Sequence, residues 1–86
     1  LTRGAVVESR TITVLIGESV IATEMGEVEA AFADVDVGSY PYFKPGASGT
    51  SIVLRGSNIP MLEQALAAIT AKLEAREIEI WSGDHK

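Results

Sequence analysis

The sequence predicts an α+β domain of the ferredoxin-like type, in the order β-α-β-β-α-β, with a four-stranded antiparallel sheet and two helices on one of its faces. Two observations predict these elements: short segments alternate apolar and polar residues, and two longer segments repeat apolar residues three and four positions apart. Because the connections of β-α-β units are right-handed, these elements are expected in the strand order 4-1-3-2. A KH-like arrangement is the nearest alternative.

The first strand and the first helix are expected within residues 10–32. Alternation over residues 10–16 predicts a strand that places Ile12, Val14 and Ile16 against the helices. Ser19 is the expected N-cap of the helix that follows. Its core face is predicted to hold Ile21, Met25, Val28 and Phe32, and its solvent face Glu24, Glu27 and Glu29. Gly26 lowers the helix propensity and could mark a close approach to the sheet.

Two strands are expected between the helices. Val35 and Val37 indicate a short second strand, and residues 51–55 indicate the third. Pro41 and Pro45 cannot donate hydrogen bonds to a strand ladder, so residues 40–45 are predicted to form a shaped loop or a sheet edge.

The second helix has clearer signals than the first. Ser57 or Asn58 is the expected N-cap, and Pro60 falls in the first turn, where a missing N–H costs little. The predicted core face consists of Leu62, Leu66, Ile69 and Leu73, with Leu66 and Ile69 at its centre. Ile78 and Ile80 then predict a fourth strand that ends at Trp81.

Residues 1–9 are interpreted as a linker, residues 10–81 as a single domain and residues 82–86 as a polar tail. A start at Leu1 without a leader predicts a cytoplasmic fragment of a longer protein. The apolar runs are far shorter than the roughly 18 residues of a membrane span. The absence of cysteine excludes disulfides, thiolate metal sites and a cysteine nucleophile.

The charge distribution argues against nucleic-acid binding. The chain carries 7 basic and 12 acidic residues, for a net charge of −5, and residues 11–43 contain no Lys or Arg. Proteins that neutralise phosphates have the opposite balance. The segment from Gly46 to Gly49 matches the GXXG pattern of KH domains, but between two predicted strands we interpret it as a hairpin turn.

No catalytic residue is predicted. His85 has no second His or Cys to act with, and Glu24 and Glu27 lack the further oxygen ligands that a metal site needs. The candidate ligand-binding residues lie in and beside the proline-containing segment and are Tyr40, Tyr42, Phe43 and Lys44. These residues support the alternative hypothesis of a nucleotide- or RNA-binding module.

The uncovered face of the predicted sheet is expected to be a contact surface. If the alternating apolar residues of the strands face the helices, the remaining residues point the other way, and apolar side chains are among them. The candidate interface residues are Leu15, Val53, Arg55 and Trp81. We expect this face to dock a neighbouring domain or a second copy of the chain, the homodimer being the simplest case.

One stretch resembles a known family. The sequence Gly38-Ser39-Tyr40-Pro41, followed by Gly49-Thr50-Ser51 and an apolar strand ending in Arg55-Gly56, is similar to the carboxy-terminal part of the CinA (competence/damage-inducible protein A) family. Ser9-Arg10-Thr11 and Glu18-Ser19 also match that family's pattern, and the resemblance extends over residues 4–75.

The resemblance implies a non-catalytic accessory domain without a cofactor of its own. In the CinA family this piece follows a molybdopterin-binding-like domain of the MoaB/Mog type, to which pyrophosphatase activity on ADP-ribose is assigned. Some members add a nicotinamide-mononucleotide deamidase domain. The expected partner is therefore the molybdopterin-binding-like domain of the parent chain.

Overall fold

The computed structural model describes residues 7–81, except the side chains of Lys44 and Ala47. Six elements follow one another in the predicted β-α-β-β-α-β order. They are β1 (Glu8–Val14), α1 (Glu18–Ala31), β2 (Asp36–Lys44), β3 (Ala47–Gly56), α2 (Ile59–Ala75) and β4 (Ile80–Trp81).

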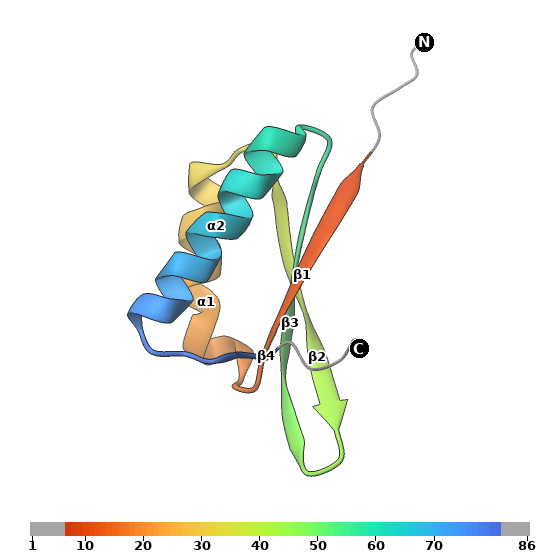
Figure 1. The fold of residues 1–86 in the computed structure, drawn as a ribbon, viewed down its shortest axis with the longest axis vertical. Helices are drawn as coiled ribbons and strands as arrows, with labels where there is room; N and C mark the ends of the chain where they lie inside the picture. Colours follow the sequence, from red (N-terminus) through yellow and green to blue (C-terminus); the bar gives the residue numbers. More distant parts are fainter. Residues whose placement is uncertain (1–6, 82–86) are drawn as a thin grey trace.

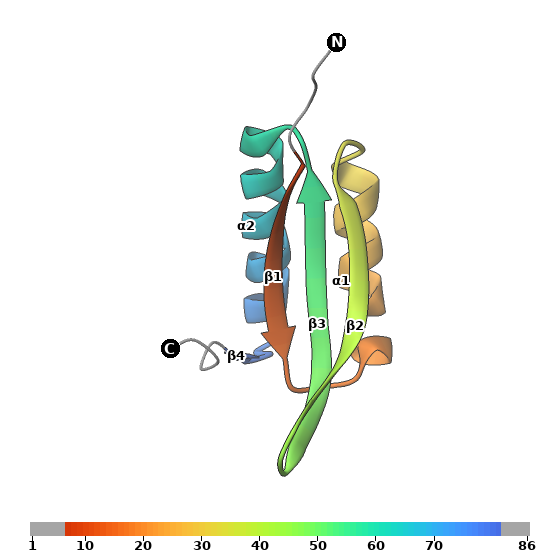
Figure 2. The same cartoon turned by 90° about the vertical axis from the view of Figure 1, so that its right-hand side faces the viewer.

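The four strands form one antiparallel sheet in the order β2-β3-β1-β4, which is the predicted order 4-1-3-2. Both helices lie on the same side of this sheet, and the other side has no helix over it (Figure 1; Figure 2). The ferredoxin-like prediction is therefore confirmed in preference to the KH-like alternative. We call the side that bears the helices the covered face and the other side the open face.

The core lies between the covered face and the two helices. Strands β1 and β3 contribute Ile12, Val14, Ile52 and Leu54 to it, as expected from their alternation. The helices contribute Ile21 and Val28 from α1 and Leu62, Ala65, Ile69 and Leu73 from α2. The prediction that Leu66 is a core centre is wrong, because the α2 face turns toward Ala65 and leaves Leu66 only partly buried.

Helix α2 has hydrogen-bonded caps at both ends. The Asn58 side chain accepts a hydrogen bond from the Met61 N–H at 3.2 Å, which confirms Asn58 as the N-cap. At the other end the N–H groups of Glu77 and Ile78 donate to the carbonyls of Glu74 and Leu73 at 2.9 Å. This is the Schellman pattern of hydrogen bonds, and it places Glu77 at a positive φ of 61°.

Helix α1 departs from the predictions in three places. Its N-cap is Gly17, which has no side chain to cap the helix, and Ser19 lies inside the first turn. Glu24, expected at the surface, is only 7% exposed, and Arg76 pairs with its carboxylate. A Cβ added to Gly26 would meet nothing within 4 Å, so Gly26 does not mark a close approach to the sheet.

Strand β2 is longer than expected. It continues through Pro41, which pairs in register with Thr50, as far as Lys44. The prediction of a loop over residues 40–45 is therefore wrong for its first five residues, and the alternative of a sheet edge is right. Because β2 is the outermost strand, Pro41 can sit within it without removing a bond from a central ladder. The turn consists of Pro45 and Gly46, and Gly46 has a φ of 81°.

The other strand limits also differ from the prediction. Strand β1 begins at Glu8, inside the predicted linker, and ends at Val14, so Leu15 and Ile16 lie in the connection to α1. Ile16 still packs against the core. Strand β4 contains only Ile80 and Trp81, because the Schellman turn occupies the residues just before it.

Candidate functional site: the open face of the sheet

The open face is built from residues that alternate with the core residues of each strand. Cross-strand register brings them into rows, such as Trp81, Thr13, Ser51 and Tyr40, which run across all four strands. The residues that this register places on the open face are Asp36, Gly38, Tyr40, Tyr42, Gly49, Ser51, Val53, Arg55, Ser9, Thr11, Thr13 and Trp81.

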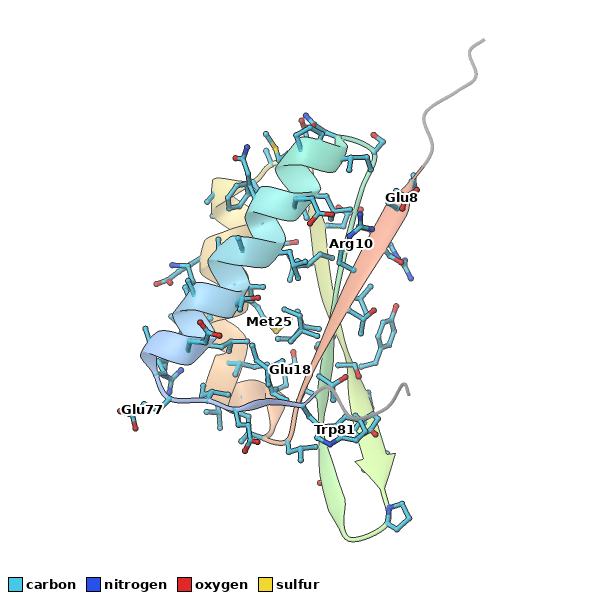
Figure 3. The ribbon with its side chains drawn as sticks, viewed as in Figure 1. Glu8, Arg10, Glu18, Met25, Glu77 and Trp81 are labelled. Atoms are coloured by element: carbon cyan, nitrogen blue, oxygen red, sulfur yellow. The ribbon has the colours of Figure 1, made fainter. Side chains whose placement is uncertain are left out.

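Two aromatic rings cover one end of this face. Tyr42 on edge strand β2 and Trp81 on edge strand β4 have ring centroids 5.2 Å apart, with an angle of 44° between the ring planes. Trp81 lies at the end of β1 remote from Glu8 and Arg10 (Figure 3). The two rings meet across β3 and β1 because the residues opposite them in register, Gly49 and Thr13, are small. Thr13 is accordingly buried although it lies on the open face.

The Gly49-Thr50-Ser51 sequence holds the end of β1 in place beneath these rings. A Cβ added to Gly49 would overlap the Val14 carbonyl oxygen and lie 2.7 Å from the Leu15 Cα. The Thr50 hydroxyl donates to the Ile16 carbonyl at 2.9 Å, and the Ser51 hydroxyl lies 3.1 Å from that of Thr13. This motif therefore has a structural role in the sheet.

A small pocket lies at the other end of the open face. Its volume is about 110 Å³, and it is lined by Asp36, Val37, Gly38, Tyr40, Val53 and Arg55. Gly38 forms the hollow: it stands between Asp36 and Tyr40 along β2, and a Cβ added there would meet nothing within 4 Å. Val53 is directly opposite Gly38 on β3, so a side chain stands next to the hollow.

Arg55 differs from the other described cations. The side chains of Arg10, Lys72 and Arg76 form ion pairs with Glu63, Glu27 and Glu24 at 2.7 to 2.9 Å. Among the residues described between 7 and 81, Arg55 has no carboxylate within ion-pair distance, although Asp36 is opposite it in register. It is exposed at the rim of the pocket. The charge of Arg55 is thus available to a group from outside the domain.

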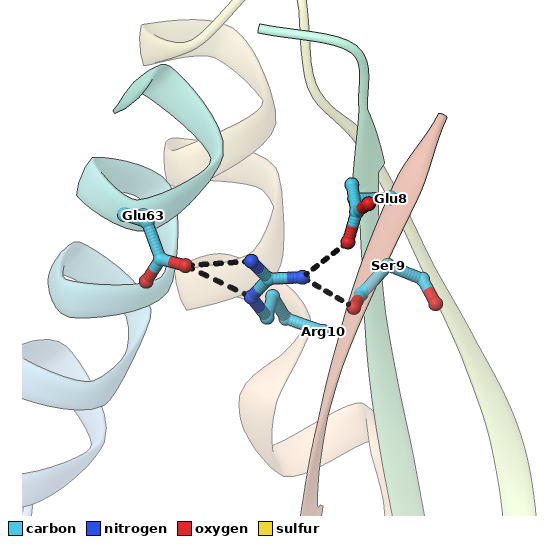
Figure 4. Close-up of polar contacts among 4 residues, drawn as sticks. All are labelled: Glu8, Ser9, Arg10 and Glu63. Atoms are coloured by element: carbon cyan, nitrogen blue, oxygen red, sulfur yellow. Dashed lines mark hydrogen bonds and ion pairs between the residues drawn. The ribbon is translucent and has the colours of Figure 1, made fainter. Parts of the chain in front are cut away.

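The paired arginines show what the other charges do. The Arg10 Nε and Nη2 both donate to one oxygen of Glu63 on α2, and its Nη1 donates to Glu8 and to the Ser9 carbonyl (Figure 4). Arg76 donates to both the Glu24 carboxylate and the Val20 carbonyl at 2.7 Å. Hydrogen bonding by Arg76 lowers the pKa of Glu24, and this outweighs the opposite effect of burial.

The candidate ligand-binding residues do not all come together. Tyr40 lines the pocket and is 51% exposed, whereas Tyr42 is engaged with Trp81. Phe43 is 74% exposed but alternates to the opposite side of β2, away from both tyrosines. The Lys44 side chain lies outside the described part of the chain.

The candidate interface residues lie along the open face and its border. Val53 and Arg55 line the pocket, Trp81 stands over the opposite end, and Leu15 follows β1 beside Gly49. Sequence reasoning missed Asp36 and Gly38 as pocket residues. Their alternation with Tyr40 was a usable signal, but it was hidden by the expectation that Pro41 would interrupt the strand.

Other kinds of site are not evident in the described residues. Residues 7–81 contain no group of three or more His, Cys, Asp or Glu placed to hold a metal ion. No helix in this part of the chain is long and apolar enough to cross a membrane.

Comparison with known proteins gave one finding. The family model described as "FAD synthase, middle domain" matches residues 6–80, which is nearly the whole chain. The search of curated proteins found no match.

Proposed function

The chain belongs to the family of FAD synthase middle domains, and we propose that it is a non-catalytic accessory domain that helps to assemble a longer protein. The observation that carries this proposal is that Arg55 has no ion pair within the described part of the domain, whereas other cations do. Arg10, Lys72 and Arg76 are used to hold the domain together, whereas Arg55 and the pocket beside Tyr40 face outward on the open face. Such a surface suits a protein partner.

Two observations support a longer parent chain. The family description calls the domain a middle domain, which implies segments on both sides. The resemblance of Gly38-Ser39-Tyr40-Pro41 and Gly49-Thr50-Ser51 to the CinA family implies a preceding molybdopterin-binding-like domain. The neighbouring part of the parent chain is therefore proposed to be a molybdopterin-binding-like domain.

The size of the pocket argues against a nucleotide as its occupant. Small-molecule sites usually measure about 300 to 1,000 Å³, whereas this pocket measures about 110 Å³. A volume of that order is sufficient for one side chain, because a cavity of about 150 Å³ holds benzene. The central strands present Thr11 and Ser51 to the open face, and these two side chains offer no aromatic surface for bases to stack on.

The competing hypothesis is that the chain is a nucleotide- or RNA-binding module. In it, the half-exposed Tyr40 would stack on a base and the neighbouring Arg55 would bind a phosphate. Calorimetric titration of the 86-residue chain with ADP-ribose, nicotinamide mononucleotide and a short single-stranded RNA tests it. We expect no saturable binding at ligand concentrations up to about 1 mM. Saturable binding that disappears in Tyr40→Ala would overturn the accessory-domain proposal.

The docking role itself is tested in the longer parent chain. We expect Tyr40→Ala and Val53→Lys to speed proteolytic cleavage between the domains, because a docked open face protects the connections. Glu29→Lys, an exposed change on α1, is the matched control and should leave cleavage unchanged. Equal cleavage rates for all three variants and the wild type would show that the open face is not docked in the parent.

A further inference from the structure

The pocket region is complementary to itself. Gly38 on β2 is a hollow and Val53, its partner in register on β3, is a projection beside it. One row further along, Asp36 on β2 faces Arg55 on β3. Each row therefore pairs a feature on β2 with its complement on β3: the first row is complementary in shape and the second in charge.

A second copy that packs face to face would use this complementarity twice. A two-fold axis parallel to the strands and midway between β2 and β3 exchanges the positions of the two strands. It places Val53 of each copy over Gly38 of the other, and Asp36 of each copy over Arg55 of the other. A closed interface of this kind needs only one self-complementary patch.

We propose that the open face pairs with the open face of a second copy, with Val53 inserted at Gly38 and Asp36 paired with Arg55 between copies. The proposal rests on the proposed assembly function and names the partner. Its support is the charge complementarity of the two rows and the lack of an ionic partner for Arg55 among the described residues. Tyr40, half-exposed at the same pocket, adds aromatic contact area.

Pairing along the β2 edge of the sheet fits the structure less well, because Pro41 in the middle of that strand has no N–H to offer to an approaching strand. Association through the open face needs no backbone hydrogen bonds. The expected interface therefore consists of side chains, and its ion pairs make it sensitive to salt.

The test is sedimentation equilibrium of the 86-residue chain over a concentration series up to about 1 mM. We expect the wild type to dimerise, and Asp36→Arg and Arg55→Asp each to raise the dissociation constant at least about tenfold, since each puts like charges together. An equimolar mixture of the two variants should dimerise again, because the two arginines at positions 36 and 55 of one copy then face two aspartates of the other.

Two further variants separate shape from charge. Gly38→Val fills the hollow, and the Cβ that it adds meets nothing within 4 Å in its own copy, so the fold should survive while dimerisation is lost. Glu29→Arg on α1 changes the net charge as much as Asp36→Arg does and should leave the dimer intact. Circular dichroism of each variant shows that it is folded.

A wild type that stays monomeric over the whole series overturns the inference. A dimer that persists in both charge variants overturns it as well, because the dimer then uses another surface. The accessory-domain proposal still stands after either result if Tyr40→Ala and Val53→Lys speed cleavage of the parent chain. Sedimentation of the isolated chain thus tests the dimer, and proteolysis of the parent chain tests the accessory role.

Discussion

The two β-α-β halves of the molecule are held in different ways. The second half, from β3 to β4, begins its helix with the Asn58 cap and ends it with a Schellman turn formed by local hydrogen bonds. The first half, from β1 to β2, has Gly17 as the N-cap of its helix, which provides no side-chain hydrogen bond, and carries Gly26 within the helix. This helix is held in place instead by contacts from the other half.

These contacts run from the second half to the first at several points. Arg76 binds Glu24 and the Val20 carbonyl, Lys72 binds Glu27, and Glu63 binds Arg10. Thr50 holds the Ile16 carbonyl at the start of the same helix connection. The comparison shows that the second half provides its own helix ends, while the first depends on the tertiary structure. Substitutions in both halves test this comparison.

The largest effect is expected for Gly49→Ala. The new methyl group would overlap the backbone of Val14 and Leu15, so β1 and β3 could not keep their present register. We expect a loss of about 4 kcal/mol or more in the free energy of unfolding. Gly46→Ala should cost about 1 to 2 kcal/mol through its positive φ, and Gly38→Ala close to nothing. Urea unfolding measures all three, and equal losses would contradict the proposed clash.

Ile69→Ala should have the next largest effect. Ile69 is fully buried between α2 and the sheet, so a cavity should cost about 2 to 5 kcal/mol. Leu66→Ala, on the partly buried border of the same helix, should cost less than half as much. Chemical denaturation compares the two variants. If Leu66→Ala is the more damaging, α2 is rotated relative to the structure.

Arg76→Met should weaken the first half although it changes the second. It leaves the Glu24 carboxylate buried with no cation, and Glu24 Oε1 already has no partner among the described residues. We expect the free energy of unfolding to fall by about 1 to 3 kcal/mol at pH 7. This range is lower than that for a fully buried ion pair, because solvent screens the partly exposed Arg76. Thermal unfolding measures it, and hydrogen exchange should increase more in α1 than in α2. Equal increases in the two helices would contradict the dependence of α1 on Arg76.

The same pair predicts a pH dependence. The pKa of Glu24 is lowered from its ordinary value of 4.5, so its contribution to stability is complete above that pH and is lost as the pH falls through the lowered pKa. Wild-type stability should therefore decrease below about pH 4.5, and Arg76→Met should show a smaller decrease. An unchanged acid dependence in the variant would exclude Arg76 as the cause of the shift.

Asn58→Ala should cost about 1 kcal/mol by removing the cap of α2. Ser57→Ala is the control, because Ser57 was the other candidate, whereas the Met61 N–H donates to the Asn58 side chain. Thermal unfolding of the two variants tests the assignment. A larger loss for Ser57→Ala would show that the cap lies one residue earlier.

Gly26→Ala has the smallest expected effect and the opposite sign. The new methyl group meets nothing, and alanine favours the helix, so we expect a gain of up to about 1 kcal/mol. A higher thermal unfolding temperature would show that low helix propensity limits the stability of α1. A loss would indicate that Gly26 is needed for packing.

The sequence by itself determined the element order, the strand order and most of the core. Alternation at Ile12, Val14, Ile52 and Leu54 and the helical spacing at Leu62, Ile69 and Leu73 report burial directly, because each depends only on local geometry. Local chemistry likewise limited the N-cap of α2 to Ser57 or Asn58, of which the structure shows Asn58. Val53, Arg55 and Trp81 were placed on the open face for the same reason, since alternation assigns a side to every strand residue.

Only the tertiary structure decided the remaining features, because each depends on residues far apart in the chain. Glu24 is a buried carboxylate whose charge is matched by Arg76, which reaches it from the end of α2. Pro41 belongs to a strand because β2 lies at the edge of the sheet, a position that no local pattern specifies. The pocket exists because pairing of β2 with β3 brings Asp36 and Gly38 beside Arg55 and Val53.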